Sequence, residues 1–489
     1  RIVNADRSIA LERLLSRLPD ACISGDRDSL ITAIEVDSRA IAPGALFVAL
    51  RGSQSDGHRY IADALARGAR AVVVEERIGD VPGAAVIQVD DTRRALSALS
   101  AAFFDDPSRK IDVVGITGTN GKTTAAHMVA AICNGAGMPC GVLGTIGAEF
   151  GGRRWALENT TPLPPVLHGL LAQMRGQGAK AAAMEVSSHA LALDRVEDVA
   201  FRVAVLTNVG RDHLDFHETL EAYAAAKRRL FLLAPACVLN LDDPYGARWA
   251  GELAAEGRTI VTYGTDSGAM LVPTGIVAEP DRTLFTLDGR RFELRLPGRF
   301  NVWNALASIG AGRILGIDDA AAANALEQLE RVVGRMERLT ADGVAVVIDY
   351  AHTPDALENA LRSLRETARG ALTVVFGCGG DRDRGKRPQM GAIVSALADR
   401  AYVTSDNPRG EDPRIIIEEI VAGMTGGNYV VEADRRRAIE RAIAQARSGD
   451  VVLVAGKGHE TYQIVGDRIL QFDDAAVASE ALAARGALK

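Results

Sequence analysis

The chain has 489 residues, more than one hydrophobic core usually accommodates, so we expect two to four domains. Hydrophobic residues make up 47% and charged residues 24%, as in a soluble globular protein, and a net charge of -7 without a marked basic face argues against a nucleic-acid-binding protein. We expect neither a membrane span nor a signal peptide, and the five cysteines, which lack metal-ligand spacing, indicate reduced thiols of a cytoplasmic protein.

The first part of the chain, residues 1–90, alternates short apolar runs with turns and predicts a small α/β domain. The expected elements are strands at 47–50, 71–74 and 85–89 and a helix at 61–68. Polar clusters at 37–39 and 53–58 lie beside the strands. Without further context, these clusters are ordinary turns.

The second part, residues 91–337, opens on an amphipathic helix from Thr92 to about residue 104. Strands then alternate with helices, which predicts a parallel sheet with crossover helices. A strand at 181–185 ends in Glu185, and a later strand leads to the segment that contains His213. Because ligands of open α/β sheets lie beyond the carboxyl ends of the strands, these two side chains are candidates for one phosphate and metal site.

The most informative stretch of this second part is a strand, a glycine-rich loop and a helix start between residues 113 and 132. Gly118 and Gly121 allow successive backbone N–H groups to point at one concave spot, and the helix N-terminus adds positive potential. Lys122 can reach a terminal phosphate, and a following Thr can hold Mg²⁺. The first glycine of the strict phosphate-loop pattern is replaced by Ile116. A turn that binds nothing is the alternative, but the order of the elements favours phosphate binding.

The third part, residues 338–489, predicts a second doubly wound domain. Its expected strands lie at 344–352, 372–377, 401–404 and 451–454. Each of these strands ends in a polar loop, and the loops define a separate ligand-binding edge. The short basic cluster at 435–437 stands beside acidic residues and is expected to form a solvated helix face.

Five motifs of the chain resemble those of the Mur ligases, the enzymes that build the peptide of bacterial peptidoglycan. The motifs are Gly118–Thr124, Glu185–His189, Asp212–Asp215, Arg299–Ala305 and Gly334–Glu337. The resemblance covers essentially the whole chain. It implies an α/β protein of three domains: a small UDP-substrate-binding domain at 1–90, a central ATP-binding domain with a mostly parallel sheet at 91–337, and a Rossmann-like acceptor domain at 338–489.

The resemblance also implies a reaction. ATP would phosphorylate the D-Glu side chain of UDP-N-acetylmuramoyl-L-alanyl-D-glutamate, and an amine of meso-2,6-diaminopimelate would attack the acyl phosphate to form an amide. Transfer of the γ-phosphate requires positioning and charge stabilisation more than covalent help. The implied cofactors are ATP and Mg²⁺, and we expect a monomer that acts in cytoplasmic peptidoglycan precursor synthesis.

Individual residues receive roles from the same resemblance. The implied ATP-binding residues are Gly118, Thr119, Asn120, Gly121, Lys122, Thr123, Thr124, Asn301, Arg335, Asp349 and His352. The UDP-substrate residues are Val36, Ser38, Ser53, Gln54, Ser55, Asn159, Thr160, Thr161, Ser187 and Arg195. The diaminopimelate residues are Arg382, Asp406, Asn407, Pro408, Arg409, Gly456 and Glu460. The catalytic set is Lys122, Glu185, His213 and Lys227, and the metal set is Thr123, Glu185, His213 and Lys227 as a carbamate.

Lys227 matches the family position at which a lysine is carbamylated to N6-carboxylysine. A free ammonium would repel Mg²⁺, whereas a neutral lysine can take up CO₂ and become an anionic oxygen ligand. The residues alone favour a surface lysine beside Arg228 and Arg229. The resemblance favours the carbamate.

The motif Asp406–Arg409 is similar to the acceptor motif of the family members that add diaminopimelate. Meso-diaminopimelate differs from lysine by one distal carboxylate, and a forked guanidinium such as that of Arg409 suits this group. The bland alternative is an Asn-Pro turn before the next helix. Lysine-adding or folylpolyglutamate synthase-like ligases are alternatives within the architecture, and a phosphate-loop switch or transport ATPase is the alternative from another class.

Overall fold

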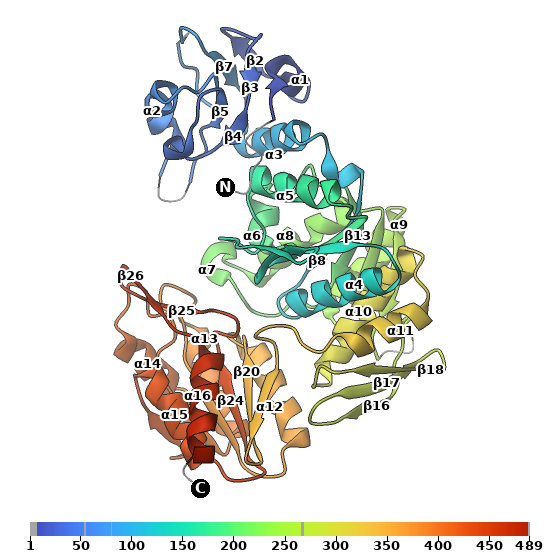
Figure 1. Cartoon of the computed structure of the whole chain (residues 1–489), viewed down its shortest axis with the longest axis vertical. Helices are drawn as coiled ribbons and strands as arrows, with labels where there is room; N and C mark the ends of the chain where they lie inside the picture. The colour runs from blue at the N-terminus through green and yellow to red at the C-terminus, as the bar shows by residue number, and fades with distance from the viewer. Residues whose placement is uncertain (1–6, 53–54, 80, 266–267, 488–489) are drawn as a thin grey trace. The chain divides into compact units, whose positions relative to one another are not determined.

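The structure is a computed structural model that describes residues 7–52, 55–79, 81–265 and 268–487. The candidate residues Ser53 and Gln54 lie outside the described residues. The chain forms two compact units, residues 1–117 with 138–204 and 226–236, and residues 118–137 with 205–225 and 237–489. Parallel-rich sheets flanked by helices confirm the α/β class expected from the sequence (Figure 1).

The N-terminal sheet has the order β2-β7-β6-β5-β4, with β4 to β7 parallel. The elements here are β1 (Ile9–Ala10), α1 (Leu11–Leu15), β2 (Cys22–Ser24), β3 (Leu30–Ile31), β4 (Ala33–Glu35), η1 (Ser38–Ala40), β5 (Ala45–Val48), η2 (Gly57–Tyr60), α2 (Ile61–Ala66), β6 (Ala71–Val74), β7 (Ala85–Gln88) and α3 (Thr92–Phe103). Successive strand residues face opposite sides, so Leu46 packs with α1 and α3 while Phe47 packs with α2. Helix α3 therefore joins this core, although it follows the boundary expected at residue 90.

The central part contains an eight-stranded sheet of order β11-β10-β9-β12-β8-β13-β14-β15 and a three-stranded sheet of order β16-β17-β18. Its strands are β8 (Asp112–Thr117), β9 (Cys140–Gly144), β10 (Gly147–Phe150), β11 (Arg153–Trp155), β12 (Ala181–Glu185), β13 (Phe201–Leu206), β14 (Ala236–Asn240), β15 (Thr259–Tyr263), β16 (Thr274–Ala278), β17 (Thr283–Leu287) and β18 (Arg290–Leu294). Its helices are η3 (Pro107–Arg109), α4 (Lys122–Gly135), α5 (Pro164–Gly176), α6 (Ser188–Ala192), α7 (Leu214–His217), α8 (Leu220–Leu232), α9 (Pro244–Ala255), α10 (Phe300–Ile314) and α11 (Asp319–Gln328). The parallel strands β8, β9 and β12 confirm the expected sheet, whereas the antiparallel strands β10, β11 and β16 to β18 were not expected.

The C-terminal sheet has the order β19-β20-β24-β21-β22-β23, and only β19 of these strands is antiparallel to its neighbour. Its strands are β19 (Glu337–Ala341), β20 (Val344–Asp349), β21 (Leu372–Phe376), β22 (Arg400–Val403), β23 (Tyr429–Val431) and β24 (Val451–Ala455), followed by the hairpin β25 (Tyr462–Val465) and β26 (Arg468–Gln471). Its helices are α12 (Pro354–Thr367), α13 (Lys386–Leu397), α14 (Pro413–Val421), α15 (Arg435–Gln445) and α16 (Asp474–Ala487). Helices α12 to α14 pack on one face and α15 and α16 on the other, which confirms a doubly wound sheet.

The basic cluster at 435–437 is not simply a solvated helix face, and the expectation was wrong for Arg435. This side chain is fully buried, and its NH2 donates to Asp474 Oδ2 at 2.6 Å and to the carbonyl of Ala455 at 3.0 Å. A buried guanidinium is tolerated here because a carboxylate and backbone carbonyls satisfy its donors. Arg436 and Arg437 remain largely exposed.

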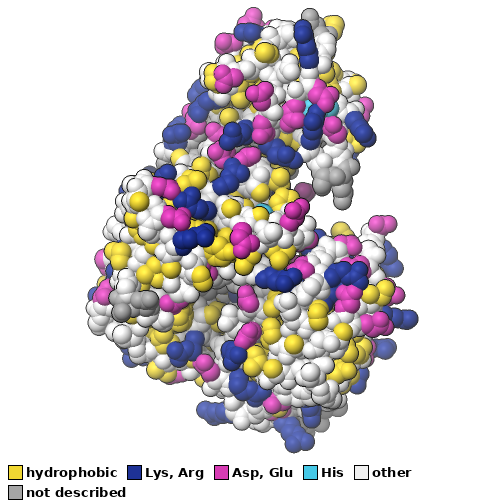
Figure 2. All heavy atoms as spheres, turned by 180° about the vertical axis from the view of Figure 1, so that it is seen from behind, with side chains coloured by type: hydrophobic (Ala, Val, Ile, Leu, Met, Phe, Trp, Pro, Cys, Tyr) yellow, Lys and Arg dark blue, Asp and Glu magenta, His cyan; other side chains and the backbone are white. Residues whose placement is uncertain are grey.

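The described surface carries acidic and basic side chains that are interspersed on the face shown in Figure 2. Among the described residues, no helix combines the length and the apolar character needed to cross a membrane.

Candidate active site

The glycine-rich loop lies between β8, whose last five residues are buried, and the first turn of α4. Gly118 and Gly121 have φ angles of 150° and 86°, a region that side chains rarely adopt. A Cβ atom at Gly118 would lie 1.9 Å from Thr207 Oγ1, and one at Gly121 would lie 2.3 Å from Asn304 Oδ1. Both positions therefore require glycine, and the backbone forms the cradle that a nucleotide phosphate needs.

The segment after β13 holds this loop in place. The carbonyl of Asn208 accepts from the N–H of Thr119 at 2.8 Å, and its side-chain oxygen accepts from the N–H of Asn120 at 3.0 Å. Thr207 Oγ1 donates to the carbonyl of Asn120 at 2.6 Å. The sequence analysis did not assign Thr207 or Asn208 to the site, because their contribution depends on neighbouring strands rather than on a motif.

Lys122 and Thr123 occupy the positions expected of phosphate and metal ligands. The Lys122 ammonium donates to the carbonyls of Gly118 and Thr119, both at 2.9 Å, so it is held over the loop. Thr123 is 3% exposed, and its hydroxyl accepts from Arg335 NH2 at 2.8 Å. The structure thus brings Arg335 to the loop from a distant part of the chain.

Other expected nucleotide residues support the local backbone. The Asp349 carboxylate accepts from the N–H groups of Met336 and Ala351, both at 2.8 Å, and burial raises the pKa of Asp349. Asn301 donates to the carbonyl of Pro297 at 2.8 Å and accepts from Asn304 at 3.0 Å.

Asp212 forms the centre of a charged cluster that the motif analysis had not resolved. Burial acts to raise its pKa, but the positive charges of His213, His352, Lys386 and Lys122 hold the pKa of Asp212 down to about 2. His213 Nε2 lies 3.4 Å from Asp212 Oδ2, and the backbone of His213 has φ 54°, a strained conformation typical of functional sites. Burial lowers the pKa of His352 to about 4, and Lys386 acts in the same direction. A carboxylate that stays ionised beside the ammonium groups of Lys122 and Lys386 is suited to ordering charged groups around a phosphate.

Glu185 lies at the carboxyl end of β12, where it pairs in register with Ile116 of β8, and its side chain is 1% exposed. Its two carboxylate oxygens accept from the N–H and the hydroxyl of Thr145, at 2.8 and 3.0 Å. Thr145 had not been singled out, since a lone threonine after a strand carries no sequence signal. That Glu185 and the glycine-rich loop share one metal stays a prediction.

The expected dipeptide-binding residues form a continuous set around Glu185. Thr145 lies 3.1 Å from the hydroxyl of Thr160, and the Thr161 hydroxyl donates to the carbonyl of Glu185 at 2.9 Å. The Thr161 hydroxyl and carbonyl accept from the N–H of Ser187 and from Arg195 NH1, both at 3.0 Å. Asn159 is exposed beside them.

Lys227 lies on α8 and is 1% exposed, so the interpretation as a surface lysine was wrong. Among the described residues, no three His, Cys, Asp or Glu side chains gather into a metal site.

The acceptor motif lies at the carboxyl end of β22, beside the ends of β21 and β24. Asn407 is 2% exposed and donates to Glu460 Oε2 at 2.8 Å. Lys457, which had not been singled out, is fully buried and donates to Asn407 Oδ1 at 3.1 Å and to Glu460 Oε2 at 3.0 Å. A Cβ at Gly456 would lie 2.5 Å from Asp406 Oδ2, which requires glycine at this position.

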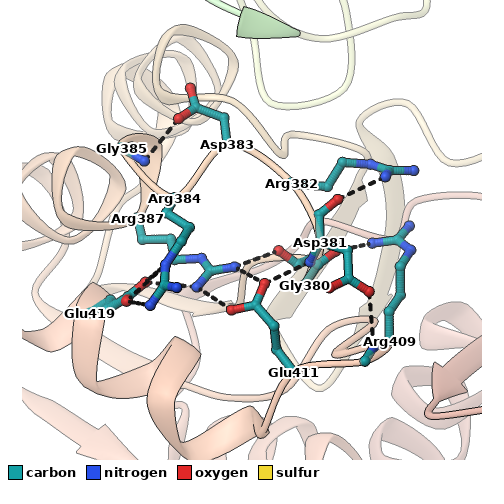
Figure 3. A network of polar contacts seen from close by, with 12 residues as sticks. Gly380, Asp381, Arg382, Asp383, Arg384, Gly385, Arg387, Arg409, Glu411 and Glu419 are labelled. Atoms are coloured by element: carbon teal, nitrogen blue, oxygen red, sulfur yellow. Dashed lines mark hydrogen bonds and ion pairs between the residues drawn. The ribbon is translucent and has the colours of Figure 1, made fainter. Parts of the chain in front are cut away.

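Two arginines border this edge of the sheet (Figure 3). Arg409, after Pro408, donates from NH1 to the carbonyl of Gly380 at 2.9 Å, and Arg382 donates from NH1 to the carbonyl of Asp381 at 2.9 Å. A guanidinium carries five donors, so one bond to a carbonyl leaves most of them for a carboxylate.

The candidate residues of the N-terminal domain are more dispersed. Ser38 opens η1 and is 7% exposed, Val36 is half-buried, and the exposed Ser55 hydroxyl lies 3.2 Å from that of Tyr60. Their role toward a nucleotide sugar stays a prediction.

Comparison with known proteins gives consistent matches along the chain. Residues 30–104 match the model "Mur ligase family, catalytic domain", residues 116–312 match the Mur ligase middle domain, and residues 334–458 match "Mur ligase, glutamate ligase domain". Curated relatives named UDP-N-acetylmuramoyl-L-alanyl-D-glutamate–2,6-diaminopimelate ligase include that of Chlorobaculum tepidum, 46% identical over 89% of both chains. The relative of Gloeobacter violaceus with the same name is 44% identical over 98% of this chain and 99% of its own. A solved structure of a ligase of that name is 32% identical, with a TM-score of 0.69 over 98% of this chain and 99% of the other.

Proposed function

The chain belongs to the Mur ligase family, and from this premise we propose that it is the ATP-dependent ligase that joins meso-2,6-diaminopimelate to the D-Glu of UDP-N-acetylmuramoyl-L-alanyl-D-glutamate. The amide would form in peptidoglycan precursor synthesis, in the cytoplasm, by a protein acting as a monomer. The observation that carries the choice of acceptor is Arg409, whose guanidinium binds the Gly380 carbonyl at the sheet edge and which follows Asn407, the partner of Glu460, in the same loop.

Phosphorylation of the D-Glu carboxylate would use the glycine-rich loop. The loop amides and Lys122 would bind the β- and γ-phosphates of ATP, with the Lys122 ammonium moving from the two loop carbonyls onto the phosphate. Arg335, which donates to Thr123, would add a second cation. These groups fit an anionic phosphate because the cradle admits no Cβ at Gly118 or Gly121.

Thr123, Glu185, His213 and carbamylated Lys227 would hold Mg²⁺, which when bound supplies positive charge to the phosphates. The threonine hydroxyl and the Glu185 carboxylate are oxygen ligands of the kind that Mg²⁺ prefers. The burial of Lys227 supports the carbamate, because burial favours the neutral amine, the form that can take up CO₂.

The acceptor would then attack the acyl phosphate. Arg409 and Arg382 would meet the carboxylates of diaminopimelate. Asp406 and Glu460 would accept from its distal ammonium, and Asn407, which donates to Glu460, would hold that carboxylate in place. Lysine lacks the distal carboxylate, so a bound lysine would leave the Arg409 guanidinium without a carboxylate partner. A site of this kind discriminates strongly against the analogue that lacks the polar group.

The remaining assignments belong to the same proposal. Residues 1–90 with Val36, Ser38 and Ser55 would bind the uridine diphosphate end, and the set around Thr161 would bind the muramoyl dipeptide. The domain boundaries are part of the same proposal. The second stays at residue 337, and the first, expected at residue 90, is placed shortly after α3 because that helix packs on the N-terminal sheet.

The test is a kinetic comparison of diaminopimelate and lysine as acceptors, in wild type and in two variants of Arg409. Wild type is expected to prefer diaminopimelate by ~10³-fold or more in kcat/KM. Arg409→Ala should lose mainly diaminopimelate-dependent kcat/KM, and Arg409→Lys should recover part of it, because it keeps the charge but not the fork. Arg414→Ala, at an exposed position of α14, is the matched control. Equal use of the two amino acids by wild type would refute the acceptor assignment.

A further inference from the structure

Behind the two acceptor arginines lies a third arginine that no proposed ligand contact uses. Arg387, in the first turn of α13, is 0% exposed. Its NH1 and NH2 donate to Glu411 at 2.9 and 2.8 Å, and NH1 also donates to Glu419 Oε2 at 2.7 Å (Figure 3). NH2 further lies 3.3 Å from the carbonyl of Gly379. One buried cation therefore links α13, α14 and the loops after β21 and β22.

Glu411 extends this link to the neighbouring loop. Its Oε1 accepts from the N–H of Asp381 at 2.6 Å while both oxygens bind Arg387. The hydrogen bonds from Arg387 lower the pKa of Glu411 to about 2, so the carboxylate is ionised at neutral pH. Glu411 thus joins the loop that carries Arg382 to the loop that carries Arg409.

The two loops are strained and interlocked. Asp381 has φ 52° and Arg409 has φ 50°, a region that non-glycine residues rarely adopt and that persists only where surrounding contacts enforce it. The N–H of Gly410 donates to Asp381 Oδ2 at 3.0 Å, and a Cβ at Gly380 would lie 1.9 Å from the Pro408 carbonyl. Because the two loops are in such close contact, they move together. The distance between them therefore depends on the buried Arg387 and Glu411 side chains that join them.

We propose that Arg387 and Glu411 are positioning residues for acceptor recognition, which set the spacing between the Arg382 and Arg409 guanidiniums. The inference rests on the proposed function, because that function makes these guanidiniums the partners of the substrate carboxylates. Neither Arg387 nor Glu411 touches the substrate. Their contribution is preorganisation: a carboxylate bound by forked donors is sensitive to displacements of about 1 Å, which can cost on the order of 10²-fold in rate.

The decisive variant is Glu411→Gln, which keeps the shape and an oxygen for the Asp381 N–H but loses the charge that Arg387 requires. We expect KM for diaminopimelate to rise by roughly 10- to 100-fold, with KM for ATP and for the UDP substrate within about twofold of wild type. Glu411→Asp keeps the charge on a shorter side chain, and its KM for diaminopimelate is expected to lie between those of wild type and Glu411→Gln. Arg414→Ala, at an exposed position of α14, is the control and should leave all three constants unchanged.

A purely structural role for the pair predicts a different result. In that case Glu411→Gln would lower the melting temperature and raise all three KM values together, or would leave them all unchanged, and either outcome would overturn the proposal. If Glu411→Gln does not fold, Arg387→Lys, which keeps one cation without the fork, must show the same selective rise. Failure of the proposed function is distinguishable, because wild type would then not use diaminopimelate at all, whereas failure of this inference leaves wild-type use intact.

Discussion

Lys227 is an amine held at 1% exposure on α8, and its chemistry can be tested directly. If it is a carbamate that helps to hold Mg²⁺, Lys227→Ala should lose roughly 10²–10³-fold in kcat, because the metal loses one anionic ligand and with it positive charge at the phosphate. Added acetate should partly restore the rate, and carbon-13 bicarbonate should give a carbamate signal in wild type that the variant lacks. Lys180→Ala, at an exposed position, is the control. A wild-type protein without the signal would exclude the modification.

His168 is a second buried ionisable side chain, and it affects stability rather than catalysis. Both of its ring nitrogens lack a hydrogen-bond partner, and burial lowers its pKa to about 3. The folded protein therefore binds this proton more weakly than the unfolded chain, whose histidine titrates at about 6.5. The resulting stability is complete above pH ~6.5 and is lost as the pH falls towards 3, at up to ~1.4 kcal/mol per pH unit.

The variant His168→Leu should flatten this pH dependence, because the buried group no longer titrates. The measurement is the free energy of unfolding in urea at pH 7 and pH 5, for wild type and variant. A variant whose stability falls by as much as that of wild type over this interval would show that His168 is not the responsible group.

At the scale of elements, α15 and α16 are joined by the Arg435–Asp474 pair, in which both side chains are fully buried. Removing one partner leaves an uncompensated buried charge, so Asp474→Ala should lower the free energy of unfolding by ~3–5 kcal/mol. The exposed pair between Arg436 and Glu480 joins the same helices, and Glu480→Ala should cost about 1 kcal/mol or less. Urea denaturation of the two variants measures the difference. Similar losses would mean that burial does not decide the strength of the pair.

The elements that could be predicted from the sequence are those in which nearly every residue is buried. Strands β8, β12, β20 and β24 are apolar runs because helices cover both faces of a parallel sheet. Strand β16 has only half-buried or exposed residues, and β17 and β18 mix buried with half-buried or exposed residues, so their sequences do not stand out from loops.

The candidate site divides in the same way. Local motifs predicted the glycine-rich loop and the acceptor turn, because consecutive residues determine the backbone geometry of both. Thr145, Lys386 and Lys457 could not be predicted, because their partners Glu185, Asp212 and Glu460 are identified only once the strands are adjacent. Arg435 was misjudged for the same reason, as its partner lies on another helix.

At the scale of the whole molecule, the ligase should release ADP only as it forms amide. We expect ADP release in a coupled assay to require both the UDP-muramoyl dipeptide and diaminopimelate, because the carboxylate accepts the phosphate and the amine removes it. Omission of either substrate should lower the rate by at least ~10²-fold, and product and ADP should appear in equal amounts. Steady hydrolysis without the two substrates would favour the switch or transport ATPase instead.

The left-handed backbone at Arg409, with φ 50°, has a consequence for how this protein can be improved in the laboratory. A non-glycine residue in that conformation costs on the order of 1–3 kcal/mol, and glycine would relieve most of this strain. Selection for thermal stability alone would therefore favour Arg409→Gly. We expect the selected protein to be more stable but to have lost its preference for diaminopimelate over lysine. Thermal stability and acceptor specificity therefore favour different residues at position 409. A screen for thermostable variants must also select for the preference for diaminopimelate over lysine.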